Sequence, residues 1–524
     1  MPSIIVMVGK SMVLTVSDNS QQQSDSLTPG QICAPGGGDN CSSGTVRASQ
    51  SPTAAGSVLF SLGGQAVKVA TQVGGTLVLA RLLQPSAYGS FSLAFCVVSF
   101  AQLFKDGFAL AAIQKAELTD EESSTLFWIN CSTGALVCLL MSLAAPVIAR
   151  IYHAPVLASI TFALAVSVLI SYVSNHHLAL LRRQMRFSTV AVIDQFAAVI
   201  AMISGIVAAL AGWQIWSLVM MQATLVACTA CGVLSSYRWH PVRIRWQSTV
   251  ELLRYGREVI CSDIATYVTR NFDNLLIGWS CGMTQLGLYD RAYNIMQMPM
   301  VNMLVPTANV AHSALSREQS NQTKFARLSR NFATATTAMG MFGSSYLFVH
   351  CDRLVPLILG NSWLGVIPVM HALTPAAFID AGIMTVCMLL LASGSTKAYF
   401  KLKLFAAVLA LGAFFLGVRW GTVGVAVAFS VSRLCAFVYG WYLARAASLD
   451  ASGVMRDSLA LPMVSSLFAA TLALCLQPIM PHSLLLGLAA STVSFCFAWA
   501  SIWLMFASGR QKICALIQHG SRAS

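Results

Sequence analysis

The stretch RNFDNLLIG, residues 270–278, places an arginine, an aspartate and two asparagines inside a run that is long and apolar enough to cross a bilayer. A charged side chain at the centre of a membrane helix costs about 2.5–3.5 kcal/mol on insertion scales. A sequence that keeps such residues there uses them either as a structural pair or along the path of a substrate.

The composition of the whole chain agrees with a membrane setting. The 524 residues are 56% hydrophobic and 10% charged, whereas soluble domains carry about 25% charged residues. The net charge is +13, but the basic residues recur at the ends of apolar segments and do not form a patch. This pattern predicts an all-α polytopic membrane protein and argues against a nucleic-acid partner.

The apolar runs predict about fourteen transmembrane helices, because each crossing needs about 20 apolar residues. The expected spans are 56–80, 87–111, 124–148, 155–180, 189–211, 213–236, 256–281, 286–311, 331–351, 364–392, 400–418, 420–444, 457–477 and 483–507.

The distribution of Lys and Arg orients these spans. With both termini in the cytoplasm, 23 of the 32 fall on the inner side and five on the outer side, as the positive-inside rule expects. The five outer cations are Arg81, Arg150, Arg291, Arg353 and Arg419. The remaining four lie within spans: Lys68, Lys105, Arg270 and Arg433.

A repeat divides the chain. LVLARLLQPSAYGSFSLAF (77–95) resembles LLIGWSCGMTQLGLYDRAY (275–293) at a constant offset of 198, which aligns Gly89 with Gly287. Six helices in each copy give both copies the same orientation, so we expect two parallel six-helix repeats around a central cavity. The expected parts are a disordered tail (1–55), an N-lobe (56–236), a basic cytoplasmic linker (237–255), a C-lobe (256–446), two further helices (447–509) and a cytoplasmic tail (510–524).

The charges within the spans allow two interpretations. Arg270, Asp273 and Asn274 lie on one helical face, so Arg270 and Asp273 either neutralise each other or face a substrate. Arg433 either pairs with a carboxylate on another helix or faces the cavity, and Lys105 either binds substrate or reaches the interface. Lys68 has no carboxylate in its own span, which favours contact with an anion.

Other reactive residues give weaker signals. Cys228-x-x-Cys231 has no second pair or histidine cluster, and His176 and His177 point about 100° apart on a helix, so no metal site is predicted. GGQAVK (63–68) is no phosphate-binding loop, and no catalytic constellation stands out. We therefore expect neither an enzyme nor a cofactor.

Several stretches of this sequence resemble a known protein family. RNFDNLLIGWSCGMTQLGLYDRAYNIMQMPM (270–300) resembles the polysaccharide transporter branch of the MOP flippase superfamily, which includes Wzx-type O-antigen and colanic-acid exporters. VLARLLQPSAYGSFSLAF (78–95), FKDGFALAAIQK (104–115) and LVPLILGNSWLGVIPVM (354–370) fit the same pattern. The resemblance covers about residues 56–510.

This resemblance implies two lobes around a cavity in the bacterial inner membrane. It also implies flipping of an undecaprenyl-diphosphate-linked oligosaccharide during O-antigen or exopolysaccharide biosynthesis. Membrane lipids are expected as partners, with a polysaccharide polymerase and glycosyltransferases as further ones. The alternatives are a cation-coupled drug exporter of the MATE type, which a basic cavity disfavours, and a membrane polymerase or ligase, which short outer loops disfavour.

The expected site follows from these charges. The substrate-binding candidates are Lys68, Lys105, Arg270, Asn271, Asp273, Asn274 and Arg433. The ion-coupling candidates are Asp106 and Asp380.

Overall fold

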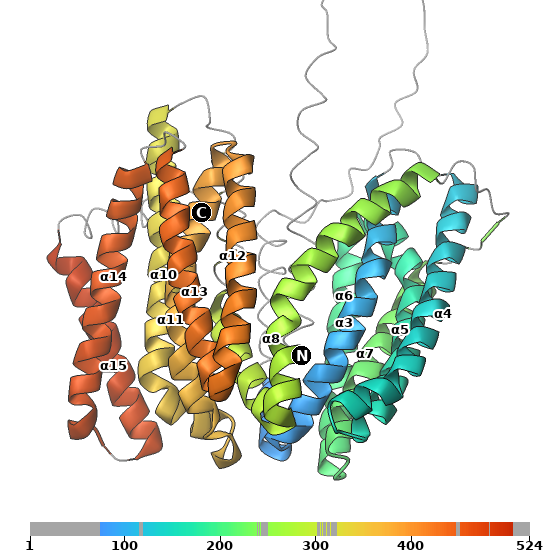
Figure 1. Ribbon diagram of the computed structural model, residues 1–524, viewed down its shortest axis with the longest axis horizontal. Helices are drawn as coiled ribbons and strands as arrows, with labels where there is room; N and C mark the ends of the chain where they lie inside the picture. The colour runs from blue at the N-terminus through green and yellow to red at the C-terminus, as the bar shows by residue number, and fades with distance from the viewer. Residues whose placement is uncertain are drawn as a thin grey trace, which may run out of the picture. The chain divides into compact units, whose positions relative to one another are not determined.

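The computed structural model describes residues 74–114, 119–237, 250–300, 322–446, 451–481 and 483–506, with isolated positions between them. The side chains of some residues inside the helices, Asp106 among them, lie outside this description. All helices with assigned bounds belong to one compact unit, Gly75–Ser524. Within the described residues every regular element is a helix (Figure 1).

The first half contains residues 74–82, which are helical, and then α3 (Pro85–Gln114), α4 (Asp120–Ile151), α5 (Val156–Arg183), α6 (Phe187–Leu210) and α7 (Ile215–Ser236). The second half contains α8 (Val250–Pro299), α10 (Gln322–Ile358), α11 (Val366–Ala392), α12 (Thr396–Gly417), α13 (Gly421–Ala446), α14 (Ala451–Leu476) and α15 (Leu484–Met505), with a short 3-10 turn, η2 (Asn361–Trp363), between α10 and α11.

The ends of α4 show why the sequence starts and stops a helix there. The Thr119 side chain accepts a hydrogen bond from the backbone of Glu122, and the Glu122 side chain accepts one from the backbone of Thr119, both at 3.3 Å. Three acidic residues occupy the first turn and Arg150 the last, so both ends of the helix dipole meet a charge of opposite sign.

Most helices carry exposed apolar side chains, as a bilayer requires. Leu143, Phe196, Val408 and Leu485 are each 63–67% exposed, a cost that only a lipid environment removes. Nine helical stretches of the described residues are long and apolar enough to cross a membrane, one of them containing both α12 and α13. The chain is therefore a multi-pass membrane protein.

The described helices follow the expected spans except at two places, and parts of two expected spans lie outside the described residues. The expected spans 256–281 and 286–311 meet in α8, where Gly282 breaks the helix with a φ of 84°. Most of residues 301–311, together with the first span up to residue 73, lie outside the described residues. The helix α8 also begins at Val250, within the segment expected to be a linker.

Two helices lie at the centre of the packing. The most apolar window of α3 is 72% buried and that of α11 is 61% buried, against 17% for α4. In Figure 1, α3 lies along α8, and α14 and α15 lie beside α10. The helix α8 contacts α3 on one side and α11, α12 and α13 on the other, so it joins the two halves and carries the stretch RNFDNLLIG between them.

Candidate functional site

The backbones of the two halves approach each other closely at two glycines. A Cβ atom on Gly89 of α3 would collide with the carbonyl of Met283 of α8, and one on Gly287 of α8 would collide with the carbonyl of Pro85 of α3. Only glycine allows the two backbones to come this close. The two glycines are the pair that the 198-residue offset aligns, and such reciprocal contacts are what two repeats packed about an axis would produce.

Polar side chains surround the glycines. The hydroxyl of Ser92 donates a hydrogen bond to Asp290 Oδ1 at 2.9 Å, and the amide of Asn294 donates one to Asp290 Oδ2 at 2.9 Å. Arg291 Nη2 lies 3.4 Å from Asp290 Oδ2, and the guanidinium stands 4.0 Å above the ring of Tyr88. Asp290 and Arg291 are buried, so the guanidinium relies on the Asp290 carboxylate and the Tyr88 ring, while its Nε has no hydrogen-bond partner among the described residues.

We name this set, Tyr88, Gly89, Ser92, Gly287, Asp290 and Arg291, the α3–α8 contact. Further bonds reinforce it from nearby segments. Trp363 of η2 donates its indole hydrogen bond to the Ala80 carbonyl at 2.7 Å and packs edge-on against Tyr88 at 5.3 Å. Arg81 donates to the carbonyl of Leu357.

Arg291 itself corrects one expectation from the sequence. The charge count assigns it to the outer side with the loop cations, but the structure places it inside α8 with 4% of its surface exposed. The ring of Tyr88 and the carboxylate of Asp290 make this burial tolerable, because they replace water around the guanidinium.

The stretch RNFDNLLIG separates its own charges. Asp273 is buried and accepts hydrogen bonds from the Tyr289 hydroxyl at 3.0 Å and from the Asn274 backbone at 2.9 Å. Arg270 is exposed, and the described contacts of Asp273 do not include it. The Asn271 amide donates to the Tyr267 carbonyl at 3.0 Å. The geometry thus gives Asp273 a structural partner on α8 and leaves Arg270 facing outward from its helix.

Arg270 instead belongs to a group of charges from four helices. Arg433 Nε of α13 lies 3.2 Å from Asp380 Oδ1 of α11, which confirms the alternative that Arg433 pairs with a carboxylate on another helix. Lys403 of α12 and Arg270 of α8 also interact electrostatically with Asp380. We name these four residues the C-lobe charge cluster.

The C-lobe charge cluster has spare hydrogen-bond donors. It holds three cations against one carboxylate. Arg433 Nε is buried against Asp380 Oδ1 without hydrogen-bond geometry, but the two side chains keep 25% and 21% of their surface exposed. A guanidinium offers five donors. The cluster therefore retains positive charge and donors that an anion can use.

The remaining candidates lie elsewhere. Lys105 of α3 is half-buried, and its carbonyl accepts a hydrogen bond from Asn175 of α5 at 3.0 Å. Lys68 and the side chain of Asp106 lie outside the described residues, so the contact of Lys68 with an anion stays a prediction.

The adjacent histidines fill an aromatic cluster. His176 Nε2 lies 2.8 Å from the Ser123 hydroxyl, and its ring packs 4.9 Å from Trp239. The ring of His177 lies 5.9 Å from that of Phe127. These contacts describe packing at the ends of α4 and α5 rather than a shared site.

Sequence reasoning missed Ser92, Asp290 and Lys403. The first two had a signal, because Ser92 and Asp290 are separated by 198 residues, the offset of the repeat. Lys403 gave no such signal in the sequence. It lies near the start of an expected span and was counted with the cytoplasmic cations, and its approach to Asp380 depends on how α11 and α12 pack.

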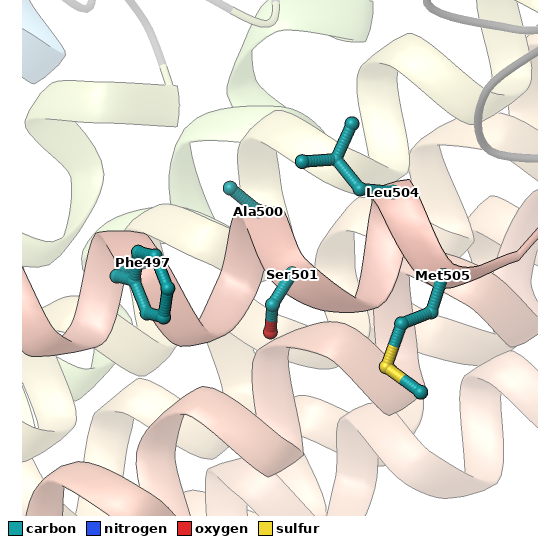
Figure 2. Close-up of a pocket in the computed structure, with 5 residues that line it drawn as sticks. All are labelled: Phe497, Ala500, Ser501, Leu504 and Met505. Carbon is teal, nitrogen blue, oxygen red and sulfur yellow. The ribbon is translucent and has the colours of Figure 1, made fainter.

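A recess on α15 offers a contrast. Figure 2 shows its five lining residues, all from this one helix: Phe497, Ala500, Ser501, Leu504 and Met505. Phe497 and Met505 are largely exposed, and the five side chains include one hydroxyl and no charge. Such a surface suits contact with lipid tails and cannot neutralise an anion.

Comparison with known proteins agrees with this fold. The chain is 23% identical over 378 residues to the lipopolysaccharide biosynthesis protein WzxC of Escherichia coli, covering 70% of this chain and 75% of that protein. It is 26% identical over 372 residues to the teichuronic acid biosynthesis protein TuaB of Bacillus subtilis, covering 68% and 75%.

Two solved structures share its architecture. The inward closed conformation of the lipid II flippase MurJ aligns with a TM-score of 0.69 at 12% identity, covering 85% of this chain and 98% of that one. An inward-facing MATE family multidrug transporter of the MOP superfamily aligns with a TM-score of 0.58 at 13% identity, covering 75% and 96%. The family model described as "Polysaccharide biosynthesis protein" matches residues 78–368, more than half of the chain, and this protein belongs to that family.

Proposed function

We propose that this protein translocates an undecaprenyl-diphosphate-linked oligosaccharide across the cytoplasmic membrane for the synthesis of a surface polysaccharide. The observation that carries the proposal is the C-lobe charge cluster, in which Arg433 pairs with Asp380 at 3.2 Å and Lys403 and Arg270 lie within electrostatic range of the same carboxylate. Membership of the polysaccharide biosynthesis protein family supplies the substrate class, and the excess of positive charge suits its diphosphate.

The cluster fits a diphosphate chemically. Arginine binds phosphate oxygens through parallel N–H donors, and this geometry favours a phosphate over a point charge. Arg270 is exposed and the Arg433 side chain keeps 25% of its surface exposed, so both guanidinium groups can approach a phosphate. In this proposal Asn271 and Asn274 lie near the sugars, Lys68 and Lys105 contribute charge from the N-lobe, and the lipid tail stays in the bilayer.

The α3–α8 contact supplies a candidate gate. Transporters built from paired bundles expose one site alternately to the two sides by rocking the bundles against each other. We propose that residues 56–236 and 256–446 form the two lobes and that the glycine approach at Gly89 and Gly287 closes one end. Asp106 and Asp380 are the candidates for coupling this motion to an ion gradient.

The same proposal includes the setting. It places the protein in the bacterial inner membrane with both termini cytoplasmic, residues 237–249 as a cytoplasmic linker and the last two helices, α14 and α15, beside the C-lobe. Membrane lipids surround it, and a polysaccharide polymerase and glycosyltransferases that make or consume the lipid-linked chain are the proposed partners.

A second candidate is a cation-coupled drug exporter. The MATE fold supports it, and so does a buried carboxylate, Asp273, of the kind that holds a proton or a sodium ion. The charge balance argues against it, because a cationic drug would approach Arg270, Lys403 and Arg433 at the cost of repulsion.

Complementation separates the two candidates. The chain, expressed in a bacterium that lacks its own O-antigen or exopolysaccharide flippase, should restore surface polymer, measured by gel analysis of extracted polysaccharide. A correctly inserted protein that restores none with any of several acceptor strains, but lowers the accumulation of a cationic dye, would replace the flippase by the exporter.

A further inference from the structure

Three unlike metal ligands converge where α10 ends and α11 begins. Cys351 and Asp352 lie in the last two turns of α10, and His371 lies in the second turn of α11. Cys351 Sγ is 2.8 Å from His371 Nε2, and the same nitrogen is 3.9 Å from Asp352 Oδ1. One ligand atom from each residue lies within 4.8 Å of the other two.

The exposure of the three residues gives the group an open side. Cys351 is fully buried, whereas the side chains of His371 and Asp352 are 39% and 49% exposed. An ion arriving from solvent would meet the imidazole and the carboxylate first and would find the sulfur beneath them. This graded exposure differs from that of surface acidic groups, which lack a buried soft ligand.

A hydrogen bond between Cys351 and His371 explains only part of this arrangement. The Cys351 thiol already donates to the Phe348 carbonyl at 3.4 Å, so it does not need the imidazole as an acceptor. His371 Nε2 lies near both the Cys351 sulfur and the Asp352 carboxylate, so the three ligand atoms face one small volume that an ion could occupy. Phe348 packs 5.0 Å from the His371 ring and helps to hold it in place.

We propose that Cys351, Asp352 and His371 form a site for a divalent transition metal of the zinc class. Thiolate, imidazole and carboxylate are the ligands zinc takes, at about 2.0–2.3 Å, with water in the fourth position of a tetrahedron. Ligand atoms of such a tetrahedron lie roughly 3.3–3.6 Å apart. The two distances here, 2.8 and 3.9 Å, bracket that range, so side-chain rotations suffice. Binding converts the thiol to a thiolate and releases its proton.

The position of the site gives the ion a structural effect. The seven residues between α10 and α11 include η2, whose Trp363 reaches Ala80 and Tyr88 of the first half. Asp352 and His371 stand on the two helices that hold this segment, and Arg353 anchors α10 to the Gly487 carbonyl of α15 at 2.7 Å. A bound ion would join the two helices at the base of the segment. The site stands apart from the C-lobe charge cluster and does not depend on the proposed transport.

The test uses the purified full-length protein in detergent, stripped of metal with a chelator. Equilibrium dialysis against Zn²⁺ should give one tightly bound ion per chain. Cys351→Ser and His371→Asn should each weaken binding by at least about tenfold, since loss of even an outer-shell partner costs 10–100-fold in metal affinity. Cys435→Ser and His153→Asn, at exposed positions, should leave the stoichiometry unchanged.

Two further readouts keep the proposal testable if a variant is unstable. Co²⁺ bound to the wild type should show a sulfur-to-metal charge-transfer band that Cys351→Ser removes. Zn²⁺ should raise the melting temperature of the wild type but not that of Cys351→Ser, while the metal-free proteins melt alike. Less than one ion per chain, or equal affinity in the wild type and Cys351→Ser, would overturn the proposal.

Discussion

Two of the arginines on α8, Arg270 and Arg291, have opposite surroundings. Arg291, in the α3–α8 contact, is 4% exposed and lies between Asp290 and the Tyr88 ring. Arg270, in the C-lobe charge cluster, is exposed and shares one carboxylate with two other cations. The same residue type on one helix is thus part of the packing at Arg291 and part of an exposed charge cluster at Arg270.

This difference separates structure from function. A buried charge is tolerable only when its partners are built into the protein, and the α3–α8 contact supplies them. An exposed cluster with surplus cations gains little for stability, since exposed ion pairs contribute about 0–1 kcal/mol, but it keeps its capacity to bind an anion. Substitutions in the first region should therefore affect folding, and substitutions in the second should affect transport.

The largest effect is expected at the glycine approach. Gly89→Ala places a methyl group against the carbonyl of Met283, a backbone group that cannot rotate away, so it should lower the free energy of unfolding by about 3 kcal/mol, the upper end of the usual overpacking cost. Gly412→Ala is the matched control, because nothing lies within 4 Å of its Cβ position and alanine improves helix propensity. Thermal unfolding in detergent measures the stability of both variants. Equal melting temperatures would show that the close approach of the two backbones does not contribute to stability.

A smaller effect should distinguish the two carboxylates. Asp290→Ala leaves the buried guanidinium of Arg291 without its charged partner and should cost about 2–3 kcal/mol. Asp380→Ala removes the partner of Arg433 in a site that is partly exposed and should cost about 1 kcal/mol or less. Denaturation in a graded detergent series compares the pair, and a larger loss for Asp380→Ala would reverse the assignment of the two regions.

The smallest effect is expected for Ser92→Ala. It removes one hydrogen bond to Asp290, which keeps its bonds from Asn294 and Arg291, so the loss should be about 1 kcal/mol. If the α3–α8 contact opens during transport, this variant should also export slightly faster or with altered sidedness. Cysteine accessibility near the contact reports on that opening, and a variant that is as closed as the wild type would confine Ser92 to a structural role.

Much of the fold could be predicted from the sequence, for identifiable reasons. Apolar length and the positions of Lys and Arg located the membrane helices, because a bilayer constrains both. The sequence predicts two separate spans where the structure has one helix interrupted at Gly282. Two adjacent apolar segments give the same pattern whether a loop or a single residue separates them.

The site was predicted less completely. The stretch RNFDNLLIG singles out Arg270 and Asp273 as candidates, but helical spacing cannot tell which of the two side chains contacts Tyr289. Lys403 and the group of Cys351, Asp352 and His371 depend on contacts between helices. Only a packed structure brings such residues together. The contact between Ser92 and Asp290 could have been suggested by the sequence, because the two residues are separated by the 198-residue offset of the repeat.

The most direct test of the account measures anion binding at the C-lobe charge cluster. A short-chain polyprenyl diphosphate is titrated into the purified protein at low salt, with Arg270→Gln, Arg433→Gln and the exposed control Arg150→Gln beside the wild type. We expect saturable binding that weakens with salt. The affinity should fall about tenfold or more in the first two variants and stay unchanged in the control. Binding of equal strength in all four proteins would contradict it.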